Sequence, residues 1–371
     1  MAGSLWAFFA TASFVATLPG AASAQGFPAQ VSAAPSVFPP ERATQKLLDD
    51  YVAAKRCEGI VVATYVSGMK RIYTAGTTGR PDLPLDGDTL FEIGSITKTL
   101  TASLLADMVQ RGEVKLDDPV SMHLPANVRV PERNGRQIRL VDLATHTSGL
   151  PGLPSNIHPK DIANPYSDYS TAMLDEFLAS YALPRDIGSK YEYSAVGMGL
   201  LGRALGHRLG RTWEAALEQR ILRPLDMRST HATLGPQLRR RLAQGHDEAG
   251  ELTPSWDIPA LPAMGALKST ANDMVKFLAA NIETDSKPFG ELFAPMHAPR
   301  ATMDEETKVG LAWQIGHATN RSIVWHGGGT GGSRALIAFE PEKRMGVVVL
   351  CNSARGADDI GFHLLDPTLP G

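Results

Sequence analysis

Apolar positions repeat with two different periods along the chain, and the two kinds of segment occupy different parts of the sequence. Apolar residues three and four positions apart predict helices over residues 41–54, 95–111, 171–182, 196–209, 213–222 and 270–282. Short runs rich in β-branched and aromatic residues predict strands over residues 59–66, 70–75, 310–315, 322–325, 334–339 and 345–351. Strands are therefore expected near both ends of the chain, with helices between them.

This order of segments predicts the domain organisation. Strands at both ends and helices in the middle are typical of an α+β fold in which a helical domain is inserted into a sheet domain. We place the sheet domain at residues 41–112 and 301–371, and the mainly helical domain at residues 113–300. Residues 25–40 are rich in Pro, Ala and Ser, and they are expected to form a flexible lead.

The N-terminal segment has the pattern of a secretory signal peptide. Residues 5–18 are apolar and uncharged, and the small residues Ala22, Ser23 and Ala24 follow them. This apolar stretch of about 14 residues is shorter than the roughly 20 that a membrane-spanning helix needs. We therefore expect residues 1–24 to be cleaved and the protein to be periplasmic or secreted, with no stable membrane span.

Composition excludes several classes of partner and cofactor. The 371 residues include 43% hydrophobic and 20% charged residues, and the formal net charge is −3. No long run of like charge predicts binding to nucleic acid or to an anionic membrane. The two cysteines, Cys57 and Cys351, form neither a zinc-binding pattern nor a CxxC pair, so they are either free thiols or a disulfide. No metal or organic cofactor is implied.

The first candidate for chemistry is the segment Gly94-Ser95-Ile96-Thr97-Lys98. Residues three positions apart share one face of a helix, so the Lys98 amine can approach the Ser95 hydroxyl. A serine hydroxyl needs such a neighbouring base to act as a nucleophile at neutral pH. A helix-capping serine and a surface lysine would have the same spacing, so this motif alone leaves both interpretations open.

Two further segments carry candidate residues. Tyr193 precedes a predicted helix, and its phenol acts as a base only if a cation such as Lys98 lowers its pKa. A core aromatic residue is the alternative interpretation of Tyr193.

The run from His326 to Gly332 follows the predicted strand over 322–325, and glycines beside a strand allow a ligand to approach the backbone closely. Backbone N–H groups of this run are candidates for binding a developing oxyanion, and a flexible turn is the alternative.

Taken together and in this order, these segments resemble one family. An S-x-x-K motif, then a Tyr-x-Asn motif, then a Lys/His-x-Gly motif is the ordered signature of class C β-lactamases and of related penicillin-binding peptidases and esterases. The likeness covers roughly residues 42–355, and the segment from Val128 to Ser148 most resembles periplasmic D-Ala-D-Ala carboxypeptidase/endopeptidases. Further segments that match the family are 114–119, 143–151, 224–227, 269–274 and 310–313.

The resemblance implies a fold and a role for each candidate residue. The fold is the β-lactamase/DD-peptidase fold, an antiparallel sheet formed by both ends of the chain and flanked by helices. Ser95 is implied as the nucleophile, and Lys98 and Tyr193 as the groups that share its proton. The N–H groups of Ser95 and Gly329 are implied as the oxyanion hole. Contacts with the substrate are implied for His326, Gly328 and Thr330.

Two positions depart from the family pattern. Ala195 stands where the family has an Asn that orients the catalytic lysine and holds the substrate amide. Gly327 lacks the hydroxyl that helps to hold the substrate carboxylate in β-lactamases, and His326 carries a charge only near or below its ordinary pKa of about 6.5. Both departures weaken the recognition of a β-lactam or of a D-Ala terminus, whereas Ser95 and Lys98 are retained.

The expected function is therefore a serine acyl-enzyme hydrolase that acts on a D-Ala peptide or an ester bond. Its substrate would be a small molecule or a fragment derived from peptidoglycan. A class C-like β-lactamase is the alternative within the family. A sensor or binding protein, acylated by a β-lactam or binding a peptidoglycan fragment without turnover, is the alternative from another class.

The resemblance also bears on the cysteines. In this family the first strand lies antiparallel beside the last strand. Cys57 precedes the first predicted strand and Cys351 ends the last one, so the fold places them near each other. A disulfide between them requires Cα atoms within about 7 Å.

Overall fold

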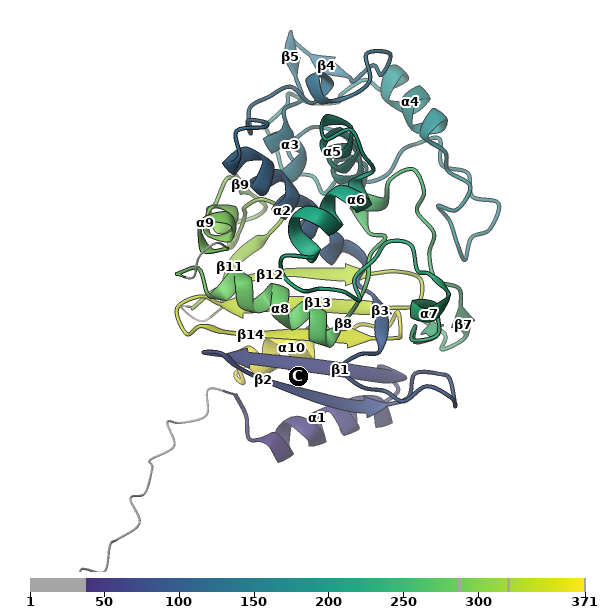
Figure 1. The fold of residues 1–371 in the computed structure, drawn as a ribbon, viewed down its shortest axis with the longest axis vertical. Helices are drawn as coiled ribbons and strands as arrows, with labels where there is room; N and C mark the ends of the chain where they lie inside the picture. Colours follow the sequence, from purple (N-terminus) through teal and green to yellow (C-terminus); the bar gives the residue numbers. More distant parts are fainter. Residues whose placement is uncertain (1–37, 286–288, 319–320, 370–371) are drawn as a thin grey trace, which may run out of the picture. The chain divides into compact units, whose positions relative to one another are not determined.

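The strands form one large antiparallel sheet that is built from both ends of the chain. The computed structural model describes residues 38–285, 289–318 and 321–369 (Figure 1). The sheet has the strand order β2-β1-β14-β13-β12-β11-β10-β9. Its strands are β1 (Gly59–Val66), β2 (Met69–Gly76), β9 (Ala301–Thr302), β10 (Thr307–Val309), β11 (Gln314–Ala318), β12 (Arg321–Gly329), β13 (Arg334–Glu340) and β14 (Met345–Cys351). The predicted fold class is confirmed.

The helices occupy the segments where the sequence predicts them, to within a few residues. The longer ones are α1 (Glu41–Ala53), α2 (Thr97–Gln110), α4 (Thr171–Ser180), α5 (Ala195–Arg208), α8 (Ala271–Ile282) and α10 (Asp358–Leu365). The shorter ones are α3 (Leu140–Ala144), α6 (Trp213–Leu217), α7 (Pro236–Arg239) and α9 (Gly290–Phe293). Small two-stranded sheets are formed by β3 (Leu90–Glu92) with β8 (Lys268–Thr270), β4 (Glu132–Arg133) with β5 (Arg136–Gln137), and β6 (Gly245–His246) with β7 (Leu252–Thr253).

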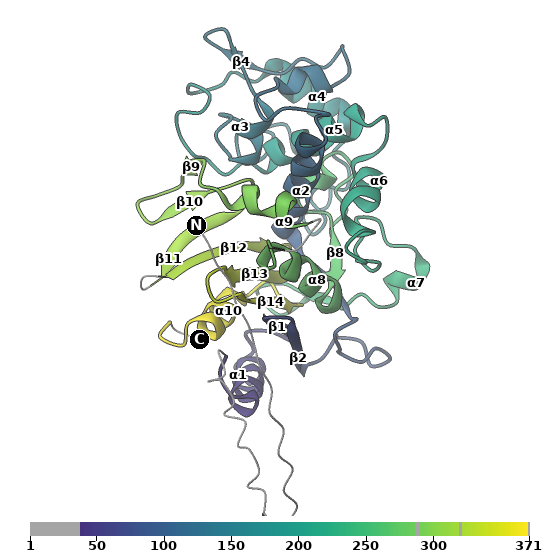
Figure 2. The same cartoon turned by 60° about the vertical axis from the view of Figure 1, so that its left-hand side comes forward.

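Helices cover both faces of the sheet, which explains why its central strands are apolar throughout. Every residue of β14 is buried. Alternate residues of a strand point to opposite faces, so Val348 packs with the cluster that includes α8, whereas Val347 and Val349 pack with α1 and α10. Figure 2 shows α8 and α10 on opposite sides of the strands.

Two predicted strand boundaries are wrong, for local reasons. The predicted strand over 310–315 is broken, because Ala312 adopts a left-handed φ of 64° and the N–H of Gly310 donates to the carbonyl of Trp313. The glycine-rich run after residue 325 is not a loop. Strand β12 continues through Gly329, because β13 pairs with it in register, with Gly327 opposite Leu336.

The predicted division into two domains remains a prediction. Within the described residues, α8 belongs to the predicted helical domain and yet packs on the sheet, and one hydrophobic cluster extends from β1 through α2 and α5 to β14. The predicted signal peptide, residues 1–24, lies outside the described residues. In the segments that the structure describes, no helix is long and apolar enough to cross a membrane.

A disulfide joins the start of β1 to the end of β14. Cys57 and Cys351 are bonded, with their Cα atoms 6.0 Å apart and 294 residues apart in the sequence. Antiparallel pairing of the two strands places Ile60 opposite Cys351, so the sheet brings the thiols together. Both side chains are fully buried. The bond closes nearly the whole described chain into one loop.

We expect removal of this disulfide to lower the free energy of unfolding by about 3–5 kcal/mol, because a cross-link over a long loop restricts the unfolded chain. The measurement is urea unfolding of the oxidised protein and of the Cys57→Ala/Cys351→Ala variant. The reduced natural protein is the control, and it should unfold at a urea concentration near that of the variant. Equal midpoints for the oxidised protein and the variant would contradict the expectation.

Candidate active site

Ser95 lies on a tight turn that connects β3 to α2. This 3-10 turn spans Gly94–Ile96, and the backbone lies close to β12 on one side. Gly94 has a φ of +47°, and a Cβ atom there would lie 2.6 Å from the N atom of Gly329. Only glycine fits that conformation and that space. The turn therefore fixes Ser95, whose side chain remains partly exposed.

Lys98 lies one helical turn after Ser95, and its amine points back to the serine. Nζ donates to Ser95 Oγ at 2.8 Å and to the carbonyl oxygen of Met264 at 2.5 Å. Burial of the amine lowers the pKa of Lys98 to about 7, because the charged form is poorly solvated there. A substantial fraction of Lys98 is therefore neutral at neutral pH, and a neutral amine accepts a proton.

Tyr193 lies just before α5, next to both residues. Lys98 Nζ is 4.9 Å from the centre of its ring. Burial raises the pKa of Tyr193 to about 12, although a hydrogen bond with Ser95 opposes the rise. The expectation that Lys98 lowers this pKa was wrong, because Lys98 itself loses its charge in the same desolvated site. Tyr193 is thus a neutral phenol that donates a proton more readily than it accepts one.

A residue that was not predicted, His146, holds Tyr193 in place. Its Nδ1 accepts the N–H of Ser194 at 3.1 Å, and its carbonyl oxygen accepts the N–H of Glu192 at 2.8 Å. Its ring packs against the Tyr193 ring, with centroids 4.5 Å apart. Burial, together with the positive charge of Lys98 and the proximity of His326, lowers the pKa of His146 well below 6.5. A neutral imidazole with Nδ1 as acceptor carries its proton on Nε2.

The end of β12 lies against the turn that carries Ser95. A Cβ atom at Gly328 would lie 2.0 Å from the carbonyl oxygen of Ile93 and 3.2 Å from the N atom of Ser95. The glycine therefore allows the two backbones to meet. Ser95, Tyr193 and the strand residues Gly327–Gly329 line one pocket of about 320 Å³. The N–H groups of Ser95 and Gly329 are the candidate donors to an oxyanion in this pocket.

His326 points into the same region and is uncharged. Its Nδ1 donates to the carbonyl oxygen of Gly327 at 2.6 Å, and its ring centroid is 6.4 Å from that of Tyr193. Burial and the charge of Lys98 lower the pKa of His326 to about 3. His326 is therefore neutral at neutral pH, and the charge expected near its ordinary pKa requires a much lower pH. Its buried Nε2 has no hydrogen-bond partner among the described residues, and it can accept a hydrogen bond from a ligand or from water.

The Thr330 hydroxyl is bound to the protein itself. It donates to the buried carboxylate of Glu92 at 2.9 Å. The other oxygen of Glu92 accepts the Ser255 hydroxyl at 2.9 Å and the N–H of Trp256 at 2.8 Å. The Thr330 hydroxyl thus already donates to Glu92, and its predicted contact with substrate stays a prediction. Glu92 lies three residues before Ser95 and ties the Ser95 segment to the residue after Gly329.

We expect Glu92→Gln to lower kcat about tenfold with little change in KM. An amide presents an NH₂ group to one of three donors, so at least one hydrogen bond is lost and the Gly329 N–H shifts. The measurement is steady-state hydrolysis of p-nitrophenyl acetate, with thermal unfolding in parallel.

The control for this variant is Ser255→Ala, which removes one donor and leaves the Thr330 contact intact. It should change kcat less than about twofold, since neither remaining partner is orphaned. A Glu92→Gln protein with a lower melting temperature and an unchanged kcat would show that Glu92 acts on stability alone.

The sequence thus identified the residues that the structure brings together around Ser95, and it missed those that support them. Glu92 had a signal, because it is the only acid within the apolar stretch from Leu90 to Ile96. His146 was noticed only as part of a family motif. The carbonyl of Met264, which orients Lys98 where the family uses the Asn now replaced by Ala195, had no sequence signal.

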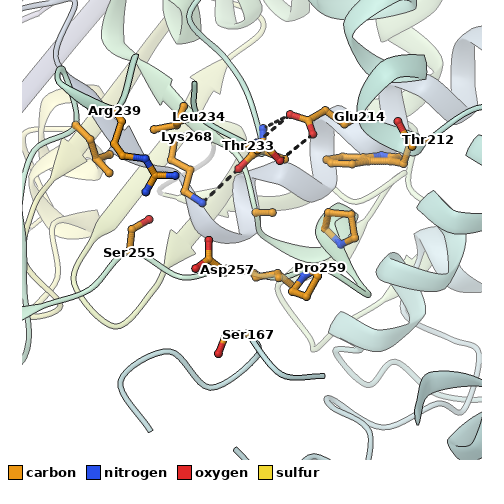
Figure 3. A pocket seen from close by; sticks show the side chains of 16 residues that line it. Ser167, Thr212, Glu214, Thr233, Leu234, Arg239, Ser255, Asp257, Pro259 and Lys268 are labelled. Atoms are coloured by element: carbon orange, nitrogen blue, oxygen red, sulfur yellow. Dashed lines mark hydrogen bonds between the residues drawn. The ribbon is translucent and has the colours of Figure 1, made fainter. Parts of the chain in front are cut away.

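A second pocket of about 480 Å³ lies apart from this chemistry (Figure 3). Its charged residues include Glu214, whose carboxylate accepts the N–H groups of Ala232 and Thr233, and Lys268, which donates to the Trp256 carbonyl at 2.9 Å. The charged groups of Glu214 and Lys268 are therefore already hydrogen-bonded to backbone atoms of the pocket wall. Within the described ranges, no group of His, Cys, Asp or Glu residues is arranged to hold a metal ion.

The chain is similar in sequence to proteins described as beta-lactamases and to proteins described as D-alanyl-D-alanine-carboxypeptidase/endopeptidases. A family model described as Beta-lactamase matches residues 44–364. A beta-lactamase of Pseudomonas fluorescens is 28% identical over 335 residues, covering 79% of this chain and 88% of that protein. The D-alanyl-D-alanine-carboxypeptidase/endopeptidase AmpH of Escherichia coli K12 is 29% identical over 307 residues, covering 77% of each chain.

Solved structures show the same fold. A class C beta-lactamase superposes with a TM-score of 0.75 at 24% identity, covering 88% of this chain and 97% of that one. The class C beta-lactamase from Rhodobacter sphaeroides superposes with a TM-score of 0.74 at 25% identity, covering 87% and 99%. The family match spans nearly all of the described chain and includes the Ser95–Lys98 pair. The chain belongs to the beta-lactamase family of serine hydrolases.

Proposed function

We propose that Ser95 is the nucleophile of an acyl-enzyme cycle that hydrolyses a D-Ala peptide or an ester bond. The observation that carries the proposal is the 2.8 Å contact between Lys98 Nζ and Ser95 Oγ, made by an amine whose pKa is about 7. In the neutral form of Lys98 the hydrogen bond reverses, and the Ser95 hydroxyl donates to Nζ. That arrangement activates the hydroxyl for attack on an acyl carbon.

The remaining residues have consistent roles in this cycle. As Ser95 Oγ bonds to the acyl carbon, its proton passes to Lys98, and the negative charge on the carbonyl oxygen is stabilised by the N–H groups of Ser95 and Gly329. Tyr193, a neutral phenol, donates its proton to the leaving group and recovers one from Lys98. Water then attacks the acyl-enzyme with the same groups acting in reverse, and the acid product leaves.

The substrate class follows from what the site lacks. Ala195 offers no amide, and Gly327 offers no hydroxyl. His326 is neutral, so no cation is fixed at that position. These features favour an ester or a short peptide over an efficiently hydrolysed β-lactam. The peptidase relative supports this order, and the relatives described as beta-lactamases support the alternative.

The cellular location is part of the proposal. The disulfide between Cys57 and Cys351 is consistent with an oxidising compartment, in which such bonds persist. Together with the signal-peptide pattern of residues 1–24, it supports export to the periplasm or beyond. A peptidoglycan-derived substrate would be present there.

The test is intact mass and turnover of the purified protein with p-nitrophenyl acetate and with a chromogenic cephalosporin. We expect turnover of the ester, and an acyl adduct that peptide mapping places on Ser95. Faster turnover of the cephalosporin would favour the β-lactamase. A stable adduct without turnover would indicate a sensor. Neither adduct nor turnover with either compound, or with D-Ala-D-Ala peptides, would refute the proposal.

A further inference from the structure

An acidic side chain, Asp358, lines the pocket beside Ser95, next to a strand residue that is glycine. Gly327 and Gly329 lie two residues apart on β12, so both present the same face. A Cβ atom at Gly327 would lie 3.4 Å from Oδ2 of Asp358, at the start of α10. A Cβ atom at Gly329 would lie 2.0 Å from Nη1 of Arg334. Both charged side chains line the 320 Å³ pocket that contains Ser95.

The two charged side chains lie beside different glycines of the strand. Arg334 lies beside Gly329, where its Nε donates to the carbonyl oxygen of Ala354 at 2.8 Å. Asp358 lies beside Gly327 and forms no hydrogen bond or ion pair with any residue that the structure describes. Partial desolvation raises the pKa of Asp358, and the positive charge of Arg334 opposes that rise. Arg334 thus lies beside Gly329, the candidate oxyanion donor, and Asp358 lies beside Gly327, which is about 7 Å further along the strand.

Asp358 lines the same pocket as Tyr193, which supplies the proton to the leaving group in the proposed cycle. Gly327, beside Asp358, directly follows His326, whose ring centroid lies 6.4 Å from that of Tyr193. His326 is neutral there, so it does not offset the charge of Asp358. Trp325 and Phe362 form an edge-to-face pair with centroids 5.8 Å apart in the same pocket wall. A carboxylate beside aromatic rings is an environment that attracts an organic cation.

We propose that Asp358 makes this subsite a binding site for an ammonium group on the leaving group of the substrate. The inference rests on the proposed function and narrows its substrate class to esters and internal peptide bonds, because a C-terminal D-Ala leaving group would bring its own carboxylate next to Asp358. Esters and amides whose leaving group carries a free amine would be preferred, and those with a carboxylate at the same place would be disfavoured. Arg334, held beside Gly329, contributes positive potential to the oxyanion site instead.

The test compares three aryl acetates that differ in the charge of the departing phenol. They are p-nitrophenyl acetate, 3-(trimethylammonio)phenyl acetate and 3-carboxyphenyl acetate, each corrected for its rate of alkaline hydrolysis. In the natural protein we expect kcat/KM for the ammonium ester to exceed that for the carboxylate ester at least tenfold, as expected for a charge a few ångströms away in a partly desolvated site. Molar salt should reduce the ratio several-fold through screening.

Asp358→Asn keeps the shape of the side chain and removes its charge. We expect the ratio to fall about tenfold in this variant. Glu342→Gln, on the exposed turn between β13 and β14, removes a charge far from the site and should leave the ratio unchanged. If Asp358→Asn does not fold, the salt dependence of the natural protein still gives the answer.

Several outcomes overturn the inference in different ways. A ratio near one in the natural protein, or an unchanged ratio in Asp358→Asn, refutes the ammonium subsite. In that case Ser95-dependent turnover of p-nitrophenyl acetate still upholds the proposed hydrolase. If the protein hydrolyses none of the three esters but cleaves a D-Ala-D-Ala peptide, the inference fails and the proposed function stands. If it turns over none of the esters, the cephalosporin or the peptide and forms no adduct, both fail.

Discussion

Replacing Ser95 with alanine is expected to lower the turnover of p-nitrophenyl acetate at least about a thousandfold, and to abolish the acyl adduct. The alanine has no oxygen to form the acyl bond, so neither Lys98 nor the oxyanion hole can replace its role. The residual rate would reflect water attacking a carbonyl held by the N–H groups of residues 95 and 329. The fold should persist, because the Ser95 side chain is partly exposed and no buried cavity results.

A matched control is available on the same helix. Ser103 is fully buried in α2, and its hydroxyl donates to the carbonyl oxygen of Thr99 at 2.8 Å. Ser103→Ala should cost about 1 kcal/mol of stability and leave kcat within about twofold. If Ser95→Ala keeps more than about a tenth of the natural turnover, another residue is the nucleophile, and the peptide map of the adduct would locate it.

The predictable part of the site is the part encoded by local spacing. Ser95 and Lys98 are three positions apart on a helix, so the pattern alone brings hydroxyl and amine together. The sheet could also be predicted from the sequence, since β-rich runs near both ends of the chain have few ways to pair other than with each other. Antiparallel pairing of β1 with β14 then brings Cys57 to Cys351.

The unpredictable part depends on contacts between distant segments. Thr330 and Glu92 are 238 residues apart, and nothing near either of them shows that their side chains meet. The same holds for Asp358, which comes close to Gly327 of β12 only because α10 packs on β13 and β14. The protonation states of the site residues could not be predicted from the sequence either, because they depend on how deeply each group is buried. The sequence allowed a charge on His326 near its ordinary pKa and a lowered pKa at Tyr193, whereas burial lowers the pKa of His326 and raises that of Tyr193.

These pKa shifts have a common cause and a chemical consequence. Lys98, His146, Tyr193 and His326 share one desolvated region, in which each group favours its neutral form. In the proposed cycle, neutral Lys98 becomes charged only when it takes the Ser95 proton, so the ammonium and the oxyanion appear together as a pair of opposite charges. The N–H groups of Ser95 and Gly329, together with Arg334, are the proposed groups that stabilise the oxyanion.

Lys98→Met is expected to remove activity and to stabilise the fold at the same time. Turnover should fall about a thousandfold or more, because Ser95 loses its base. In the natural protein, kcat/KM should rise with pH through an apparent pKa of about 7 and level off above it, as Lys98 becomes neutral. A profile that is flat between about pH 5 and pH 9 would remove Lys98 from the role of base.

The stability effect has a definite sign. The folded state holds Lys98 with a pKa lowered from 10.5 to about 7, so between these values the unfolded chain binds more protons than the folded one. The natural protein should therefore gain stability as pH rises through that window, and the full cost of burying the amine is present below it. Methionine fills a similar volume without a charge to desolvate, but it loses the hydrogen bond to the Met264 carbonyl.

We expect the free energy of unfolding of Lys98→Met to be about 2 kcal/mol higher than that of the natural protein at about pH 6, and this gain should shrink toward about pH 10. Urea unfolding at both pH values measures this difference, and a variant less stable than the natural protein at the lower pH would show that Lys98 contributes more through its hydrogen bonds than its burial costs.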